Sequence, residues 1–274
     1  MKRAFIIIGY TLIVLGAVSM IAPFLWMLSV SFMTDSQIFS YPPKILPNPI
    51  ILKNYHDVFT RLPITRFFLN SLFVAATTTI FQVLFSSMAG FAFARSKFKY
   101  KDFIFFLFLL TMMIPPQVNI IPLFFLMREL HWIDTYQALI LPGIFGGFGV
   151  FLMRQWFKGM SSEIEDAAKI DGCNFFEIFF KIALPLSTPA AVTLGLFTFI
   201  TTWNSFMWPL IVTNSEAITT LPVAVSQFRG SFREIIMWGD LCACSVILSI
   251  PVILVFLAGK KYFINDMLAG GIKE

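Results

Sequence analysis

Residues 67–94 read FFLNSLFVAATTTIFQVLFSSMAGFAFA and contain no Asp, Glu, Lys or Arg. Arg66 and Arg95 bound this window directly. A helix needs about 20 apolar residues to cross roughly 30 Å of hydrocarbon, so the segment is long enough to span a bilayer. It indicates a fold built in lipid rather than in water.

Five further windows share this property. The uncharged windows contain 18 to 29 residues each and are 4–32, 67–94, 103–127, 136–153, 186–213 and 241–258. Charged residues make up 13% of the chain, against about 25% in soluble domains. Buried helices of a large soluble protein seldom repeat such a window six times. We therefore expect an all-α membrane protein with six transmembrane helices, and one transmembrane domain over 1–274.

The basic residues predict the orientation of these spans. With a cytoplasmic N-terminus, the inner segments carry 13 Lys and Arg and the outer segments carry 7, as the positive-inside rule requires. Both termini and the loop 154–185 are then cytoplasmic. A cleaved signal peptide is the alternative for the first span, but its apolar run continues to Phe32, beyond a signal core of about 7–15 residues.

Helix-breaking residues interrupt two of the spans. Pro115 and Pro116 fall near the middle of 103–127, and Gly143, Gly146 and Gly147 crowd 136–153. Broken helices are tolerated at membrane depth only against protein or a watery cavity. These two spans are expected to face the protein interior, with simple packing kinks as the alternative.

The inner loop 154–185 contains the most informative stretch. Residues 161–185 read SSEIEDAAKIDGCNFFEIFFKIALP, which divides into two short helices around Gly172. Glycine readily takes the left-handed conformation that ends a helix. Ser162 with Glu165 forms the pattern of a capping box at the start of the first helix. Asn174, three residues before Glu177, is expected to cap the second.

Each of these short helices has an amphipathic pattern. Ile164, Ala167, Ala168 and Asp171 share one face of the first, which is small and apolar. Phe176, Phe179, Phe180 and Ala183 form the apolar stripe of the second. Such a pair could lie on the lipid interface or cover the underside of the membrane domain. The functional interpretation is a docking element for a cytoplasmic partner.

The run Glu165-Asp166-Ala167-Ala168-Lys169-Ile170-Asp171-Gly172, with Ile182-Ala183-Leu184-Pro185 after it, resembles the EAA loop of binding-protein-dependent ABC importer permeases. In that family the loop forms a coupling helix that sits in a cleft of the ATPase subunit. Asp166 stands where the family usually has Glu. The resemblance implies that coupling residues are Glu165, Asp166, Ala167, Ala168, Asp171 and Gly172.

The resemblance extends over nearly the whole chain. Trp203-Asn204 and the tail Leu268-Ala269-Gly270-Gly271-Ile272-Lys273 are similar to the carbohydrate-uptake subfamily, in particular its maltose-type subunit. His131-Trp132 replaces a more usual Gly-Leu. The family implies a second related permease subunit, an ATPase dimer that holds ATP and Mg, and an extracellular or periplasmic solute-binding protein. It also implies a bacterial or archaeal cell membrane.

The sequence carries no signal for chemistry within the chain. Gly259-Lys260-Lys261 lacks the upstream glycine and following Ser or Thr of a phosphate-binding loop. Three cysteines and two histidines match no metal-binding spacing. We expect no enzyme activity, no cofactor on this chain, no metal site and no nucleic-acid partner, since the basic pI follows from the inner loops and anionic lipids.

The spans also contain no ionisable side chain of the kind that proton-coupled carriers place there. A stand-alone facilitator or a sodium-coupled carrier remains the alternative mechanism, and a permease for another neutral solute the alternative substrate. A neutral substrate suits amides and aromatic rings, which bind hydroxyls and apolar sugar faces. The substrate-pathway candidates are Asn204, our leading one, with Trp203, Ser205, Gln82 and Gln117.

Overall fold

The computed structural model describes residues 2–227 and 237–270, which are mostly helical and contain no strand. Four helical segments are long and apolar enough to cross a membrane: Ile6–Val30, Ile64–Arg95, Tyr136–Gly159 and Trp238–Lys261. Two bent pairs, Lys101–Met112 with Pro116–Glu129 and Phe175–Leu186 with Thr188–Trp203, bring the number to as many as six. The chain is an all-helical membrane protein.

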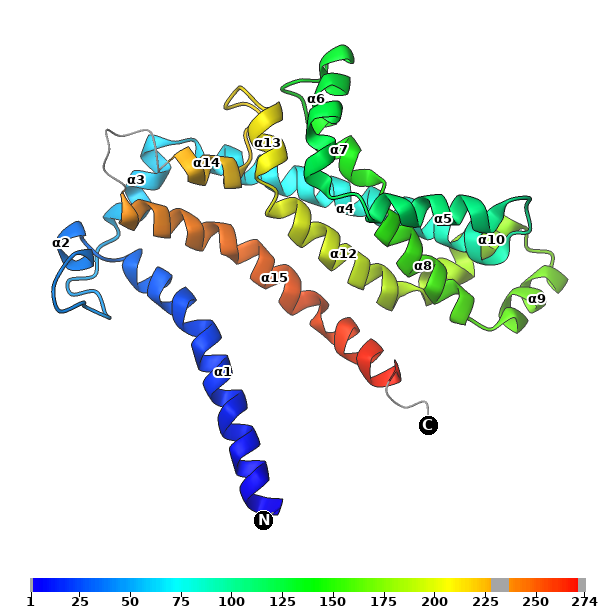
Figure 1. Cartoon of the computed structure of the whole chain (residues 1–274), viewed down its shortest axis with the longest axis horizontal. Helices are drawn as coiled ribbons and strands as arrows, with labels where there is room; N and C mark the ends of the chain where they lie inside the picture. The colour runs from blue at the N-terminus through cyan, green and yellow to red at the C-terminus, as the bar shows by residue number, and fades with distance from the viewer. Residues whose placement is uncertain (1, 228–236, 271–274) are drawn as a thin grey trace. The chain divides into compact units, whose positions relative to one another are not determined.

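The long helices and the main short helices are labelled in Figure 1. In chain order the elements are α1 (Lys2–Val30), α2 (Asp35–Ile38), α3 (Lys53–Arg61), α4 (Ile64–Arg95), α5 (Lys101–Met112), η1 (Pro116–Asn119), α6 (Ile120–Glu129), α7 (Tyr136–Ile144), α8 (Gly147–Gly159), α9 (Ser162–Ile170), α10 (Phe175–Ile178), η2 (Phe179–Ala183), α11 (Leu184–Leu186), α12 (Thr188–Trp203), α13 (Met207–Val212), α14 (Leu221–Gln227) and α15 (Trp238–Gly270).

The chain divides into two compact units, each described here by itself. The first comprises Met1–Phe68 with Leu221–Pro251, and the second comprises Leu69–Thr220 with Val252–Glu274. The sequence predicts a single permease domain. The predicted tail motif 268–273 ends outside the described residues, since 271–274 are not among them.

In the first unit, an asparagine closes the end of α1. The side-chain Nδ2 of Asn54, on α3, donates to the carbonyls of Ser31 at 3.0 Å and Met33 at 2.9 Å. These carbonyls follow the last turn of α1, where helix carbonyls lack intrahelical partners. Gly239 packs directly on this amide, because a Cβ there would lie 2.5 Å from Asn54 Nδ2.

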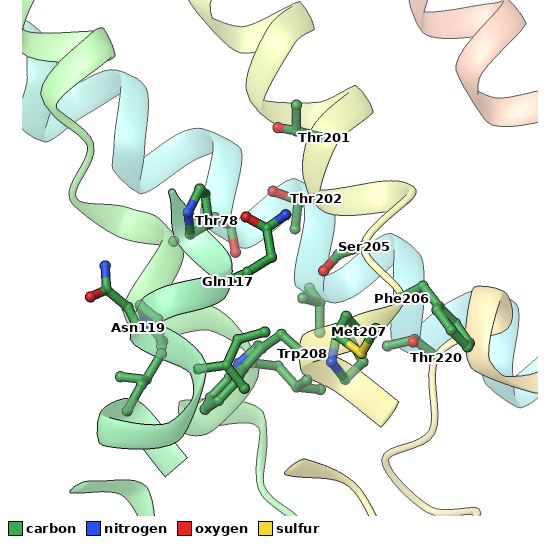
Figure 2. A pocket seen from close by; sticks show the side chains of 18 of the residues that line it. Thr78, Gln117, Asn119, Thr201, Thr202, Ser205, Phe206, Met207, Trp208 and Thr220 are labelled. Atoms are coloured by element: carbon green, nitrogen blue, oxygen red, sulfur yellow. The ribbon is translucent and has the colours of Figure 1, made fainter. Parts of the chain in front are cut away.

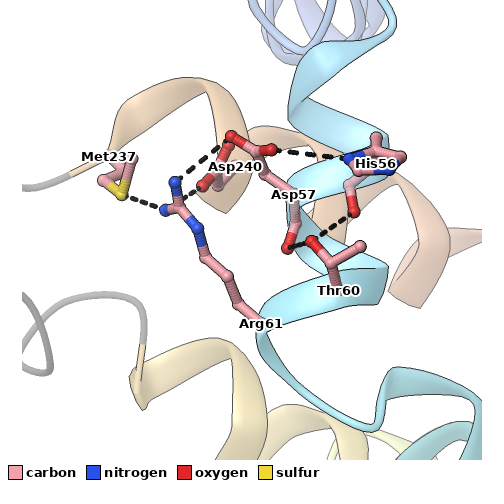
Figure 3. Close-up of polar contacts among 6 residues, drawn as sticks. All are labelled: His56, Asp57, Thr60, Arg61, Met237 and Asp240. Carbon is pink, nitrogen blue, oxygen red and sulfur yellow. Dashed lines mark hydrogen bonds and ion pairs between the residues drawn. The ribbon is translucent and has the colours of Figure 1, made fainter.

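An ion-pair cluster joins α3 to the start of α15 within the same unit (Figure 3). The guanidinium of Arg61 lies 2.8 Å from the Asp240 carboxylate and 3.2 Å from that of Asp57, and it contacts the Met237 sulfur. The Asp240 side chain is only 3% exposed. A buried carboxylate requires such a partner, since an unpaired charge is costly away from water.

The second unit is built around α8, which packs against α5 and α12 (Figure 1). Its core contains Phe91, Met153, Phe157 and Leu194, all at most 1% exposed. Gly90 allows α4 to pass closely over α8, because a Cβ at this glycine would lie 2.6 Å from the Met153 Cβ.

Three of the predicted spans are broken. The third bends by 93° between α5 and the segment that begins at Pro116, and the fourth breaks at Phe145 and Gly146 between α7 and α8. Proline and glycine predict both breaks. The sequence predicted no break in the fifth span, 186–213, but this span breaks between Trp203 and Met207. Pro209 explains this break, because its ring clashes with the carbonyl four residues earlier and it lacks an N–H.

The turn after α6 shows why glycine is usual at position 131 in the resembling family. His131 takes φ 56° and Asp134 takes φ 60°, in the left-handed region.

The Asp134 carboxylate accepts hydrogen bonds from the backbone N–H groups of Asn214 at 2.9 Å and Ser215 at 3.0 Å. Burial raises the pKa of Asp134, but these N–H donors outweigh it, so its pKa falls below the usual value.

Candidate functional site

The first candidate site is the hairpin formed by α9, Gly172 and α10. Gly172 has φ 85°, so the chain turns through the left-handed conformation that favours glycine. At the next helix start, Asn174 and Glu177 form a reciprocal capping box, with both bonds at 3.0 Å. The backbone N–H of Asn174 and the nearby Lys181 ammonium lower the pKa of Glu177. The second capping box was predicted correctly from sequence.

The predicted capping box at Ser162 and Glu165 is not formed. Ser161 is the N-cap, and its hydroxyl accepts from the Glu163 backbone N–H at 3.2 Å. Glu165 instead pairs with Arg95, the last residue of α4, with Nε and Oε1 2.6 Å apart. A guanidinium at this distance attracts the carboxylate more strongly than a single neutral N–H does, because opposite charges shielded from water interact strongly.

The Arg95 side chain holds a second part of the loop as well. Its Nη2 donates to the Met160 carbonyl at 2.6 Å, just before α9. The side chains of Arg95 and Glu165 are 16% and 7% exposed, so the pair is largely shielded from water. This ion pair fixes α9 against the end of α4.

The small face of α9 is divided between two environments. Ala168 is 5% exposed and packs into the core cluster with Phe91, Phe157 and Phe179. Ala167 is exposed, and so are Ile164, 44% exposed, and Ile170, 87% exposed. The sequence placed Ala167 and Ala168 together on one docking surface. In the structure only Ala167 is exposed, because Ala168 packs against the chain's own core.

The other predicted coupling residues lie on the open side of the hairpin. Asp166 and Asp171 are exposed, and the Asp166 carboxylate accepts from Lys169 Nζ at 2.7 Å. In the predicted apolar stripe of the second helix, Phe179 and Ala183 are buried, whereas Phe176 remains 66% exposed. Phe180 is also exposed, at 49%. The hairpin thus combines an anchored side with an apolar and acidic exposed side.

The second candidate site is a cavity of about 610 Å³ in the second unit (Figure 2). Its lining residues are Ser71, Val74, Thr78, Pro116, Gln117, Asn119, Ile120, Leu123, Leu139, Pro142, Gly143, Thr201, Thr202, Ser205, Phe206, Met207, Trp208, Pro209 and Thr220. The volume is within the range of small-molecule sites, about 300–1,000 Å³. The lining contains no charged side chain.

Two helix breaks meet at this cavity. The segment that begins at Pro116 and the α12–α13 break at Ser205 both contribute to its wall (Figure 2). Pro142, within α7, leaves the carbonyl of Ala138 without its helical N–H partner. Trp208 on α13 supplies the missing donor, with Nε1 2.9 Å from that carbonyl. The indole thereby joins α13 to α7.

The polar groups of the wall fall into two sets. Gln117, Thr202 and Ser205 are at least partly exposed, and the described part of the chain offers their side chains no hydrogen bond. The hydroxyls of Thr78 and Thr220 are buried without a partner in the same described part. An unsatisfied buried hydroxyl costs about 1–3 kcal/mol.

The structure brings two of the five predicted pathway residues into the cavity lining, Gln117 and Ser205. Trp203 is 1% exposed and stacks on Phe199 with ring centroids 5.8 Å apart. Asn204 is exposed at the end of α12, where its amide donates to the Ile200 carbonyl at 2.9 Å.

Gln82, on α4, lies beside Gly146 rather than in the cavity lining: a Cβ at that glycine would lie 2.5 Å from the Gln82 Nε2. Substrate contact by Trp203, Asn204 and Gln82 stays a prediction. Thr202 was missed by sequence reasoning, because only the folded breaks show that it lines the same space as Gln117.

The chain belongs to the family of binding-protein-dependent transport system inner membrane components, which matches residues 82–267. The family is one of transport subunits, so this chain is not an enzyme by itself. Its curated relatives confirm the membership. An arabinooligosaccharide transport system permease of Halalkalibacterium halodurans is 36% identical over 83% of this chain and 81% of its own length.

Relatives of full length agree. A lactose permease of Rhizobium radiobacter is 32% identical over 97% of this chain and 96% of its own. A trehalose/maltose permease of Thermococcus litoralis is 32% identical over 100% of this chain and 98% of its own length. Among solved structures, a bacterial ABC transporter involved in the import of the acidic polysaccharide alginate has a TM-score of 0.86 and 25% identity, covering 96% of this chain and 97% of its own.

Proposed function

We propose that this chain forms half of the translocation pathway of an ATP-driven importer for an uncharged sugar or oligosaccharide. The α9–α10 hairpin is the observation that carries this proposal. It is anchored to the chain through Glu165 and Ala168, and it leaves Ile164, Ala167 and Ile170 exposed. Exposed apolar side chains on a rigid element favour a protein partner.

The proposed partners supply what this chain lacks. ATP and Mg bind to a separate ATPase dimer, whose cleft receives the hairpin, and no cofactor binds to this chain. A second related permease completes the pathway. A solute-binding protein delivers the sugar on the outer face. A structural relative was solved in complex with an alginate pentasaccharide-bound periplasmic protein. That relative is 11% identical to this chain, so the likeness supports the fold alone.

The proposed location is the plasma membrane of a bacterium or archaeon. Both termini and the hairpin face the cytoplasm, because 13 of the 20 basic residues then lie inside. The named sugars of the relatives favour a carbohydrate substrate. A neutral substrate is favoured by the cavity, whose lining has no charged side chain.

Reconstitution tests this function. The complete importer, with ATP enclosed in proteoliposomes, is given its binding protein and a panel of neutral sugars: maltotriose, arabinotriose, lactose and trehalose. We expect uptake of at least one sugar, and only when the ATPase dimer and ATP are present. Uptake by this chain without the ATPase would instead support a facilitator or an ion-coupled carrier.

A further inference from the structure

The cavity at the two helix breaks presents a set of polar groups with free hydrogen-bonding capacity. Gln117 enters from η1, whereas Thr202 and Ser205 lie at the end of α12 (Figure 2). None of these three side chains has a hydrogen bond to the part of the chain that the structure describes. By contrast, neighbouring Thr201 donates to the Phe197 carbonyl at 2.8 Å.

The chemistry of these groups selects a class of ligand. An amide offers both donors and an acceptor, and each hydroxyl can donate and accept. A sugar hydroxyl has the same dual character, so it can bond with either group. The Trp208 Nε1 is already bonded to the Ala138 carbonyl, which leaves its ring as an apolar surface of the kind on which sugar faces pack.

The lining of the cavity offers no charged partner to a ligand. An ionised carboxylate moved out of water needs a cationic or strongly donating partner. The lining residues include no Lys, Arg or His. A uronic acid would therefore lose hydration in this cavity without compensation, whereas a neutral sugar would not.

We infer that this subunit itself binds the translocating sugar, through a subsite for a neutral sugar ring made by Gln117, Thr202 and Ser205. The inference rests on the proposed function and goes further, since an importer half can open a pathway without contacting its substrate. It also identifies Thr202 as a specificity-determining residue.

The test uses the complete importer in proteoliposomes with the same four neutral sugars. Thr202→Val and Gln117→Leu remove the polar groups while keeping similar size. We expect each to lower kcat/KM for sugar uptake by about tenfold, the effect of one lost hydrogen bond at a polar site. The loss should differ between the sugars.

Thr193→Val is the matched control. Thr193 lies on the same helix and is 8% exposed, but its hydroxyl donates to the Pro189 carbonyl at 2.9 Å and it is not in the cavity lining. It should leave the order of sugar preference unchanged. If both cavity variants transport every sugar that the wild type takes up, and at the wild-type rate, the subsite is refuted while the proposed function stands. If the wild type transports none, the proposed function fails as well.

Discussion

The Arg95–Glu165 ion pair joins the hairpin to the membrane-spanning helix α4, in addition to the packing of Ala168 and Phe179 on Phe91. Both side chains of the ion pair are largely buried and only 2.6 Å apart. Removing one partner of a buried pair leaves an uncompensated charge and costs about 3–5 kcal/mol. The movement of α9 then no longer passes rigidly to α4.

We predict that Glu165→Gln lets ATP hydrolysis continue while sugar uptake falls, so that fewer sugars enter per ATP. Hydrolysis and uptake measured in the same proteoliposomes give this ratio. Glu163→Gln is the control, because Glu163 lies on the same helix but is exposed and makes no ion pair within the described residues. An unchanged ratio in Glu165→Gln would remove the proposed role of the pair.

Gly172 gives a second prediction at this scale. Its φ of 85° strains any residue with a Cβ by about 1–3 kcal/mol, even though the space around it is open. Gly172→Val should insert into the membrane but lose sugar-stimulated ATP hydrolysis, because the hairpin changes direction. Gly159→Val is the control, since that position is equally open and has no positive φ. Equal hydrolysis rates in the two variants would contradict this.

Local features of these residues could be predicted from sequence, and long-range ones could not. The Asn174–Glu177 box and the left-handed Gly172 depend on neighbours three or fewer residues away. The partner of Glu165 lies on another helix. Helical periodicity placed Ala167 and Ala168 on one face, but it could not indicate which of them would meet the chain's own core.

At the level of helices, proline has its largest effect on this structure by breaking membrane spans. The breaks near Pro116 and Gly146 were predicted, because these residues interrupt otherwise uniform apolar runs. The break before Pro209 was not, since that proline sits close to the end of its span. Its consequence, a cavity wall made from two broken helices, depends on packing that one sequence does not reveal.

The Trp208 bond to Ala138 yields a prediction about helix pairing. Trp208→Phe should lower the free energy of unfolding by about 1–3 kcal/mol, because the buried Ala138 carbonyl loses its donor. Pro142→Ala restores a helical N–H for that carbonyl, so Trp208→Phe should cost much less in its presence. Thermal unfolding of the four proteins in a double-mutant cycle measures this coupling. Strictly additive effects would contradict the account.

For the whole molecule, the distribution of basic residues predicts which loops face the cytoplasm and which face outside. We predict that a single cysteine at Ser161 is labelled only from the cytoplasm and one at Asn214 only from outside. Both positions are exposed. Cys173, Cys242 and Cys244 are first replaced by serine, and an impermeant maleimide is applied to cells and to inverted vesicles. Labelling of Ser161→Cys in intact cells would show that the orientation is the reverse of the predicted one.

In the proposed function, ATP hydrolysis on a partner drives this subunit through the exposed side of the hairpin. Ala167 is the small residue on that side, whereas Ala168 is unsuitable for a test because it packs in the core. A tryptophan at position 167 would fill the space a docking cleft needs without touching the Arg95–Glu165 pair.

The decisive measurement is simultaneous sugar uptake and ATP hydrolysis by the complete importer carrying Ala167→Trp, with Ala167→Ser as the control of similar size. The account predicts that the tryptophan variant inserts normally, that its uptake and its sugar-stimulated hydrolysis both fall by about tenfold or more, and that the serine variant matches the wild type. Uptake by Ala167→Trp at the wild-type rate would contradict it.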